Sequence, residues 1–136
     1  MTPADLTAYL AEVFPQMTDR IVIEELAPMH ARVRYVVAQS DLRPGGTVSG
    51  PAMFTLADCA FYVATLAMIG REALTVTTSA TINFMRKPAP GDLIGEARIM
   101  KLGRSLSVGE VTVFSEGMAE PVAHATLTYS IPPQKG

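Results

Sequence analysis

The chain has 136 residues, enough for one domain that buries a hydrophobic core without disulfides or metals. Its 11 basic and 13 acidic residues give a formal charge of −2, which excludes the broad positive surface typical of nucleic-acid-binding proteins. Cys59 is the single cysteine, so a disulfide within the chain is excluded and a reducing, cytoplasmic location is expected.

The first segment predicts a helix over residues 1–16. Thr2 followed by proline suits a helix start, and Leu6, Leu10 and Val13 recur on one face. We expect this helix to cover an edge or an end of a sheet. The same residues lack the basic and apolar regions of a secretory signal, so no signal peptide is expected.

The next two segments, residues 21–26 and 30–37, predict the first β-hairpin. Both are rich in strand-forming residues, and the turn between them contains Pro28. In the second segment, apolar residues alternate with arginines, which is typical of a strand with one buried face.

Residues 50–70 predict a long central helix. Gly50 precedes a proline suited to the first helical turn, and Gly70 suits the left-handed cap that ends many helices. The run between them is apolar on every side except for one narrow polar stripe, made of Thr55, Asp58, Tyr62 and Thr65. The run approaches the length of a membrane span. However, its carboxylate and the strand-like alternation after it favour a helix buried in protein, so no membrane partner is expected.

Four further strands are predicted after the central helix. Residues 74–84 carry apolar side chains at most even positions and polar ones, including Thr77, at the odd positions. Turn residues then separate strands over residues 93–102, 105–114 and 123–131. The whole chain, residues 1–136, therefore predicts one α+β domain in which an antiparallel sheet curls around the central helix. Because one sheet cannot cover an all-round apolar helix, we expect at least a dimer.

Asp58 is the first candidate for chemistry. A lone carboxylate in an apolar run costs several kcal/mol if it is buried without a partner, so its presence needs a reason. One interpretation is a structural carboxylate that backbone donors hold or that reaches a solvated gap. The other is a general base or a nucleophile, and the flanking residues favour it.

Four spaced segments carry a family resemblance: residues 43–50 (RPGGTVSG), 56–58 (LAD), 82–92 (INFMRKPAPGD) and 101–105 (KLGRS). Together they resemble the hotdog-fold acyl-CoA thioesterases of the phenylacetate-pathway type. The resemblance implies a hotdog fold, in which a curved antiparallel sheet wraps one long helix. It also implies a homodimer or homotetramer with active sites at the subunit interface, and an acyl-CoA substrate.

The resemblance further implies roles for individual residues. Asp58 acts as general base on water or as nucleophile, the Gly50 backbone N–H polarises the thioester carbonyl, and Thr77 helps to place the water. A helix start suits a developing oxyanion because it gathers unpaired N–H groups and positive dipole. Two positions depart from the family pattern, since Ser49 replaces a common His and Arg43 replaces a common Asn. Ser49 can still donate a hydrogen bond, and Arg43 can hold a phosphate or carboxylate of the ligand.

Three basic residues and one tyrosine complete the candidate substrate site. Arg86, Lys87 and Arg104 lie in or beside predicted turns, where they either meet phosphates of coenzyme A or remain ordinary solvated charges. Tyr62 either lines the acyl pocket or packs in the core.

Other chemistries have less support. Cys59 lies off the polar stripe and is interpreted as a small core residue, and His30 and His124 lack companions at metal-ligand spacing. No metal is therefore expected, and no cofactor beyond the coenzyme A thioester as substrate. The sequence predicts an acyl-CoA thioesterase. The alternatives are a non-catalytic hotdog protein that binds an acyl-CoA or an aromatic ligand and, with less support, a dehydratase. The acyl group and the choice between dimer and tetramer stay open.

Overall fold

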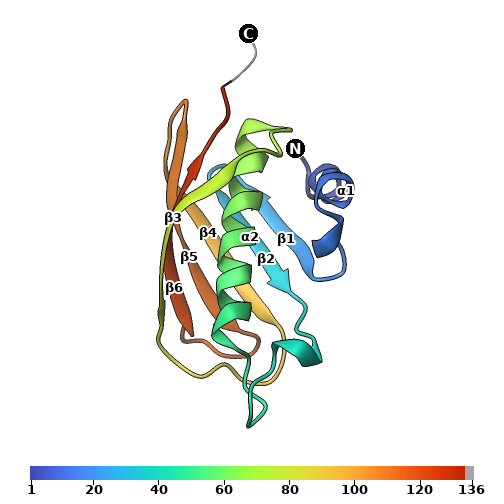
Figure 1. The fold of residues 1–136 in the computed structure, drawn as a ribbon, viewed down its shortest axis with the longest axis vertical. Helices are drawn as coiled ribbons and strands as arrows, with labels where there is room; N and C mark the ends of the chain where they lie inside the picture. Colours follow the sequence, from blue (N-terminus) through green and yellow to red (C-terminus); the bar gives the residue numbers. More distant parts are fainter. Residues whose placement is uncertain (134–136) are drawn as a thin grey trace.

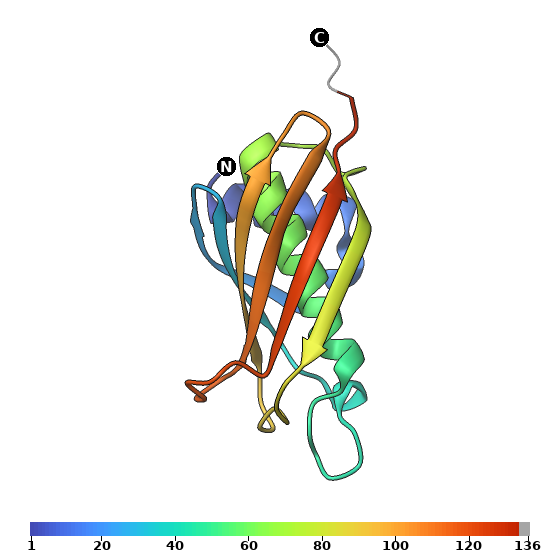
Figure 2. The same ribbon diagram turned by 90° about the vertical axis from the view of Figure 1, so that its left-hand side faces the viewer.

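A long helix, α2 (Gly50–Ile69), lies against one face of a six-stranded antiparallel sheet (Figures 1 and 2). The computed structural model describes residues 1–133. The strands are β1 (Ile21–Ala27), β2 (His30–Tyr35), β3 (Val76–Phe84), β4 (Leu93–Leu102), β5 (Leu106–Ser115) and β6 (Ala123–Ser130). Their order in the sheet is β1-β2-β4-β5-β6-β3, so β1 and β3 are the edges. The sheet curves around α2, and the predicted hotdog fold is confirmed.

The N-terminal helix, α1 (Pro3–Val13), is shorter than the predicted range of residues 1–16. It begins with a capping box, in which the Thr2 hydroxyl accepts from the Asp5 N–H and the Asp5 carboxylate accepts from the Thr2 N–H, each at 3.1 Å. It ends at Val13 because Pro15 disfavours helical geometry in the residue before it, and a short 3₁₀ turn follows. The helix packs against β1 and α2, so it covers one edge of the sheet (Figure 1).

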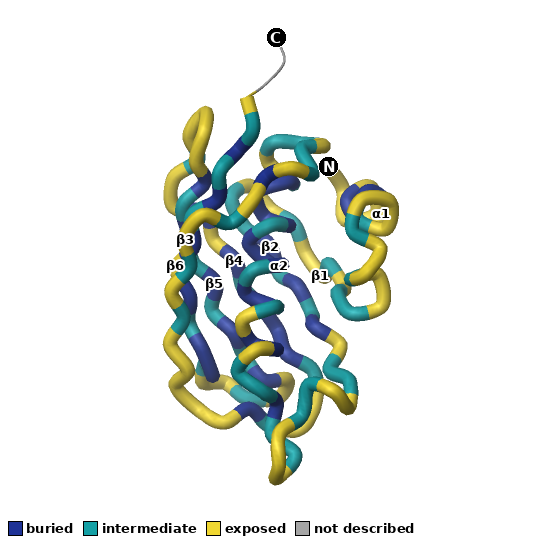
Figure 3. Tube along the Cα trace, viewed as in Figure 1, coloured by how far each residue is buried: buried dark blue, intermediate teal, exposed yellow. Residues whose placement is uncertain are grey.

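The core lies between α2 and the concave face of the sheet (Figure 3). Phe61 is fully buried there, and Gly109 on β5 makes room for it, because a Cβ at this glycine would lie 2.5 Å from the Phe61 ring. By length and composition alone α2 would suffice to cross a membrane. Within the described residues, however, 61% of its apolar window is buried in the fold, as expected of a core helix.

The polar stripe predicted on α2 is only partly continuous. Thr65 is fully buried, and its hydroxyl lies 3.0 Å from the Ser107 hydroxyl on β5. Around the helix axis Thr65 lies only about 20° from Asp58, seven residues earlier. It is buried because β5 packs against this part of α2. Only Thr55, Asp58 and Tyr62 remain on the side of α2 that is not packed into the core.

A β-bulge changes which side chains of β3 face the helix. Thr77 pairs with Tyr129 and Ser79 pairs with Thr128, so Thr78 is an extra residue in the edge strand. The extra residue shifts the alternation by one position, and Thr77 joins the helix-facing side of the strand with Ala80. The prediction that Thr77 shares a face with the later odd-numbered residues was therefore wrong. The strand also begins at Val76, two residues after the predicted start.

Candidate active site

The Asp58 carboxylate is held by two hydroxyl groups. Its Oδ1 accepts hydrogen bonds from Thr77 Oγ1 and from the Tyr129 hydroxyl, both at 2.6 Å. Burial and the neighbouring negative charge of Asp58 raise the pKa of the Tyr129 phenol, so this group stays protonated and remains a donor. The carboxylate is therefore paired, and it is fixed from β3 and β6 at once.

Asp58 opens onto a groove of about 500 Å³ between α2, the start of β3 and the end of α1. We call it the Asp58 groove, and its lining residues are Val13, Phe14, Met17, Phe54, Thr55, Asp58, Cys59, Tyr62, Ala73, Thr75, Val76, Thr77 and Tyr129. Tyr62 lines this groove, and its hydroxyl donates to the Ala73 carbonyl at 2.9 Å.

Two polar atoms at the Asp58 groove lack a hydrogen-bond partner within residues 1–133. Within residues 1–133, Asp58 Oδ2 has no hydrogen-bond partner, although Oδ1 has two. Thr75 is 3% exposed, and its hydroxyl also lacks a partner in the described part of the chain. Buried polar groups are nearly always hydrogen-bonded, so this hydroxyl indicates a position for a water or a substrate atom.

A second groove, of about 560 Å³, lies at the start of α2. We call it the Gly50 groove, and it is lined by Arg43, Thr47, Val48, Gly50, Pro51, Met53, Phe84, Met85, Arg86, Lys87 and Pro88. Three of these side chains are positively charged. The groove is therefore suited to an anionic group.

The helix start at the Gly50 groove leaves one backbone donor free. Ser49 is the N-cap, and its hydroxyl accepts from the Ala52 N–H at 3.3 Å. Pro51 has no N–H, and the Gly50 N–H has no acceptor among residues 1–133. The Phe84 ring lies over this glycine, since a Cβ there would be 3.3 Å from the ring. The Gly50 N–H is thus the unpaired backbone donor at this helix start, whereas the Ser49 hydroxyl caps the helix.

The loop that carries Arg43 is anchored by Asp41. The carboxylate of Asp41 accepts from the Arg20 guanidinium, from the Tyr35 hydroxyl at 3.0 Å and from the Ala38 N–H at 2.8 Å. These contacts hold the loop against β2 and fix its approach to the helix start.

The structure divides the predicted site residues into two groups. Thr77 lies at Asp58, whereas Arg43, Arg86 and Lys87 lie at Gly50. Along α2, Gly50 and Asp58 are eight residues apart, a rise of about 12 Å at 1.5 Å per residue. One chain therefore does not bring the predicted base and the predicted oxyanion donor together.

The basic residues differ in their surroundings. Arg86 pairs with Glu120 at 2.7 Å and donates to the Pro121 carbonyl at 2.8 Å. Arg104 lies in the β4–β5 turn, at the opposite end of the sheet from the connection that carries Arg86 and Lys87 (Figure 1). Arg104 lines neither groove.

Sequence reasoning did not identify Tyr129 or Thr75 as site residues. Tyr129 lies within the last predicted strand, residues 123–131, to which no site residue was assigned. The sequence did contain a hint of the contact between Tyr129 and Asp58. A buried tyrosine needs a hydrogen-bond partner for its hydroxyl, and Asp58 is the carboxylate of the buried helix.

The cysteine and the two histidines have other surroundings in the structure. Burial, together with the charge of Asp58, raises the pKa of the Cys59 thiol to about 12, which agrees with a small core residue. His30 pairs with Glu96 at 2.7 Å and His124 with Glu110 at 2.8 Å.

Comparisons with known proteins identify the family of this chain. The family model of the thioesterase superfamily matches residues 45–122. The structure of a candidate thioesterase from Silicibacter sp. TM1040 is 55% identical and superimposes with a TM-score of 0.91, covering 98% of this chain and 93% of that one. A mutant of the phenylacetic acid degradation protein PaaI from Thermus thermophilus is 29% identical, with a TM-score of 0.74 and coverage of 87% and 99%.

Zebrafish thioesterase superfamily member 2 shares the fold at 19% identity, with a TM-score of 0.83 and coverage of 97% and 99%. A search of curated protein sequences gave no match. The family match extends over more than half of the chain and includes Gly50, Asp58 and Thr77. The chain belongs to the thioesterase superfamily.

Proposed function

We propose that the protein is an acyl-CoA thioesterase in which Asp58 activates water. The observation that carries this proposal is the state of the Asp58 carboxylate: two hydroxyls fix Oδ1, while Oδ2 has no partner within residues 1–133 and borders a groove. A water at Oδ2 would give up a proton to the carboxylate as its oxygen attacks the thioester carbonyl carbon. The C–S bond then breaks, and the coenzyme A thiolate leaves and takes up a proton.

The separation of the two grooves favours an active site shared by two subunits. β3 is an edge strand that pairs only with β6, and three apolar residues on it or next to it are about half exposed: Val76, Phe84 and Met85. An exposed apolar edge strand is a ready surface for pairing with a second copy. Antiparallel two-fold pairing would bring the start of β3, near Asp58, beside the end of the partner's β3, near the Gly50 groove.

The Gly50 groove supplies the second half of this site. Its free backbone N–H would stabilise the oxyanion of the tetrahedral intermediate. Arg43, Arg86 and Lys87 would meet the phosphates of coenzyme A, since guanidinium and ammonium groups bind phosphate well. Arg104 lies outside both grooves of its own chain, and a contact from it to coenzyme A would need the partner subunit.

A non-catalytic acyl-CoA-binding protein is the second candidate. The Ser49 hydroxyl caps α2, so the side chain at the family's histidine position is engaged in helix capping. A thiol-release assay across acetyl-, butanoyl-, octanoyl- and phenylacetyl-CoA separates the two candidates. Release of thiol supports the thioesterase, whereas binding without release supports the binding protein.

A complementation experiment tests the shared site. Asp58→Asn removes the base, and Gly50→Pro removes the N–H at a position where proline suits a helix start and where Ser49 already has extended geometry. Each variant alone should be inactive. Refolded together, they should form mixed dimers with one intact site, and activity should return to about a quarter of the wild-type level, the statistical result for random mixing. Inactive mixed dimers would refute the shared site.

A further inference from the structure

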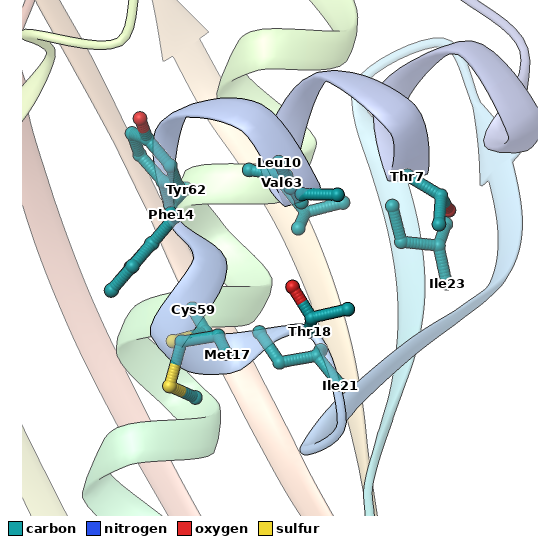
Figure 4. A pocket seen from close by; sticks show the side chains of 11 residues that line it. Thr7, Leu10, Phe14, Met17, Thr18, Ile21, Ile23, Cys59, Tyr62 and Val63 are labelled. Atoms are coloured by element: carbon teal, nitrogen blue, oxygen red, sulfur yellow. The ribbon is translucent and has the colours of Figure 1, made fainter.

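A narrow apolar cavity lies beneath α1, next to the Asp58 groove (Figure 4). The cavity has a volume of about 30 Å³. Four residues line both spaces: Phe14, Met17, Cys59 and Tyr62. The cavity therefore adjoins the candidate active site, and these four side chains stand between the two spaces.

Its lining suits a hydrocarbon. Seen in Figure 4, Met17 and Cys59 lie at one end, and Thr7 and Ile23 lie at the other. The lining residues include no charged side chain, and most are aliphatic, aromatic or sulfur-containing. An apolar group that leaves water for such a space gains free energy in proportion to the area it buries.

We propose that this cavity, the tail cavity, receives the end of a straight-chain acyl group whose thioester carbonyl lies at Asp58. This assignment rests on the proposed thioesterase function. It adds the class of acyl group, which the sequence leaves open, and gives α1 a role in selecting it.

The size of the tail cavity favours a straight chain over an aromatic ring. A dry cavity that binds benzene has a volume of about 150 Å³, far more than the tail cavity offers. A space of about 30 Å³ is roughly the liquid volume of one water molecule, so it accepts only the tip of a chain. Met17 lies where the two spaces join, and its flexible, unbranched side chain can move aside as the chain passes.

The test fills the cavity and compares substrates of two lengths. Thr18 is exposed and its side chain points into the cavity, so Thr18→Leu adds bulk there with little strain on the core. Thr7→Leu fills the far end in the same way. Thr126→Leu is the matched control, because it makes the same change at an exposed position of β6 that lines neither the tail cavity nor the two grooves.

Both cavity variants should lower kcat/KM for octanoyl-CoA by tenfold or more, since one methylene in an apolar pocket changes kcat/KM by about 10- to 200-fold. Their kcat/KM for butanoyl-CoA should stay within twofold of wild type, and the control should change neither value. Equal losses for both substrates, or no loss for octanoyl-CoA in either variant, would overturn the assignment.

A binding measurement keeps the cavity testable apart from catalysis. The probe is a thioether analogue of octanoyl-CoA, which cannot be hydrolysed, measured by calorimetry against wild type and the two cavity variants. If wild type releases thiol from no acyl-CoA, the proposed function fails. The tail cavity is then supported if its variants bind the analogue at least tenfold more weakly than the control, and overturned if they bind it equally well.

Discussion

Replacing Asp58 by asparagine separates its catalytic role from its structural one. Asn keeps the size of the side chain, and its carbonyl oxygen still accepts from Thr77 and Tyr129, but it carries no charge and cannot take a proton from water. General-base catalysis contributes about 10²- to 10⁴-fold, so kcat should fall on the order of a hundredfold or more. KM should stay close to the wild-type value, because the groove keeps its shape.

The structural cost of the same change follows from the two hydrogen bonds. A bond to a charged acceptor contributes about 1.5–3 kcal/mol and a neutral one about 0.5–1.5 kcal/mol, so each bond loses about 1 kcal/mol. The free energy of unfolding should therefore decrease by about 2 kcal/mol at most. Urea unfolding measures this change, and the thiol-release assay measures kcat.

A control variant on the same helix guards against a general effect of lost stability. Thr65→Val removes the buried contact with Ser107 and should also cost about 1–2 kcal/mol, but it should leave kcat unchanged because Thr65 faces the sheet. Wild-type turnover in a folded Asp58→Asn protein would refute the catalytic assignment. So would an equal fall in kcat in the control.

Three further predictions concern stability and its link to function. Thr75→Val removes a buried hydroxyl that has no partner in the described residues, so the melting temperature should rise. If a substrate atom meets this hydroxyl, kcat/KM should fall severalfold, and unchanged activity would show that it meets no ligand. Gly109→Ala places a Cβ 2.3 Å from the Arg98 carbonyl oxygen, so the free energy of unfolding measured in urea should fall by about 3 kcal/mol. In the control Gly103→Ala the nearest atom to the new Cβ is 3.6 Å away, so the free energy of unfolding should hardly change. The hydrogen bond from His124 lowers the pKa of Glu110. The Glu110 carboxylate therefore stabilises the fold at pH values above its unfolded-state pKa, and this stabilisation is lost as the pH falls through the lowered, folded-state pKa. In Glu110→Gln the free energy of unfolding should accordingly fall less steeply below about pH 4.3. The difference should be under about 1 kcal/mol because the pair is partly exposed to water, and an identical pH profile would contradict this role.

Local patterns in the sequence determined most of the secondary structure. The central helix was located from a Gly-Pro start, an apolar run and a terminal glycine, and α2 follows those signals to within one residue. Strand-forming residues, alternation and turn residues likewise predicted the six strands. Such features depend on neighbours a few positions apart along the chain, which the sequence displays directly.

The same local signals identified Asp58, because a lone carboxylate in an apolar helix is visible without any tertiary structure. Together with the spaced motifs, it led to the family that the comparisons confirm. The expectation that a second subunit covers part of α2 stays a prediction.

The composition of the site was decided by contacts between distant parts of the chain. Thr77 meets Asp58 because a bulge shifts the alternation of β3, and a bulge depends on strand pairing that periodicity does not reveal. Tyr129 reaches Asp58 across 71 residues of sequence, through the placement of β6 beside the helix. The separation of Gly50 from Asp58 follows from helix geometry, but their division between two grooves depends on how β3 and the loop before α2 pack around the helix. The pairing and packing of distant segments set these positions, so only the tertiary structure decided them.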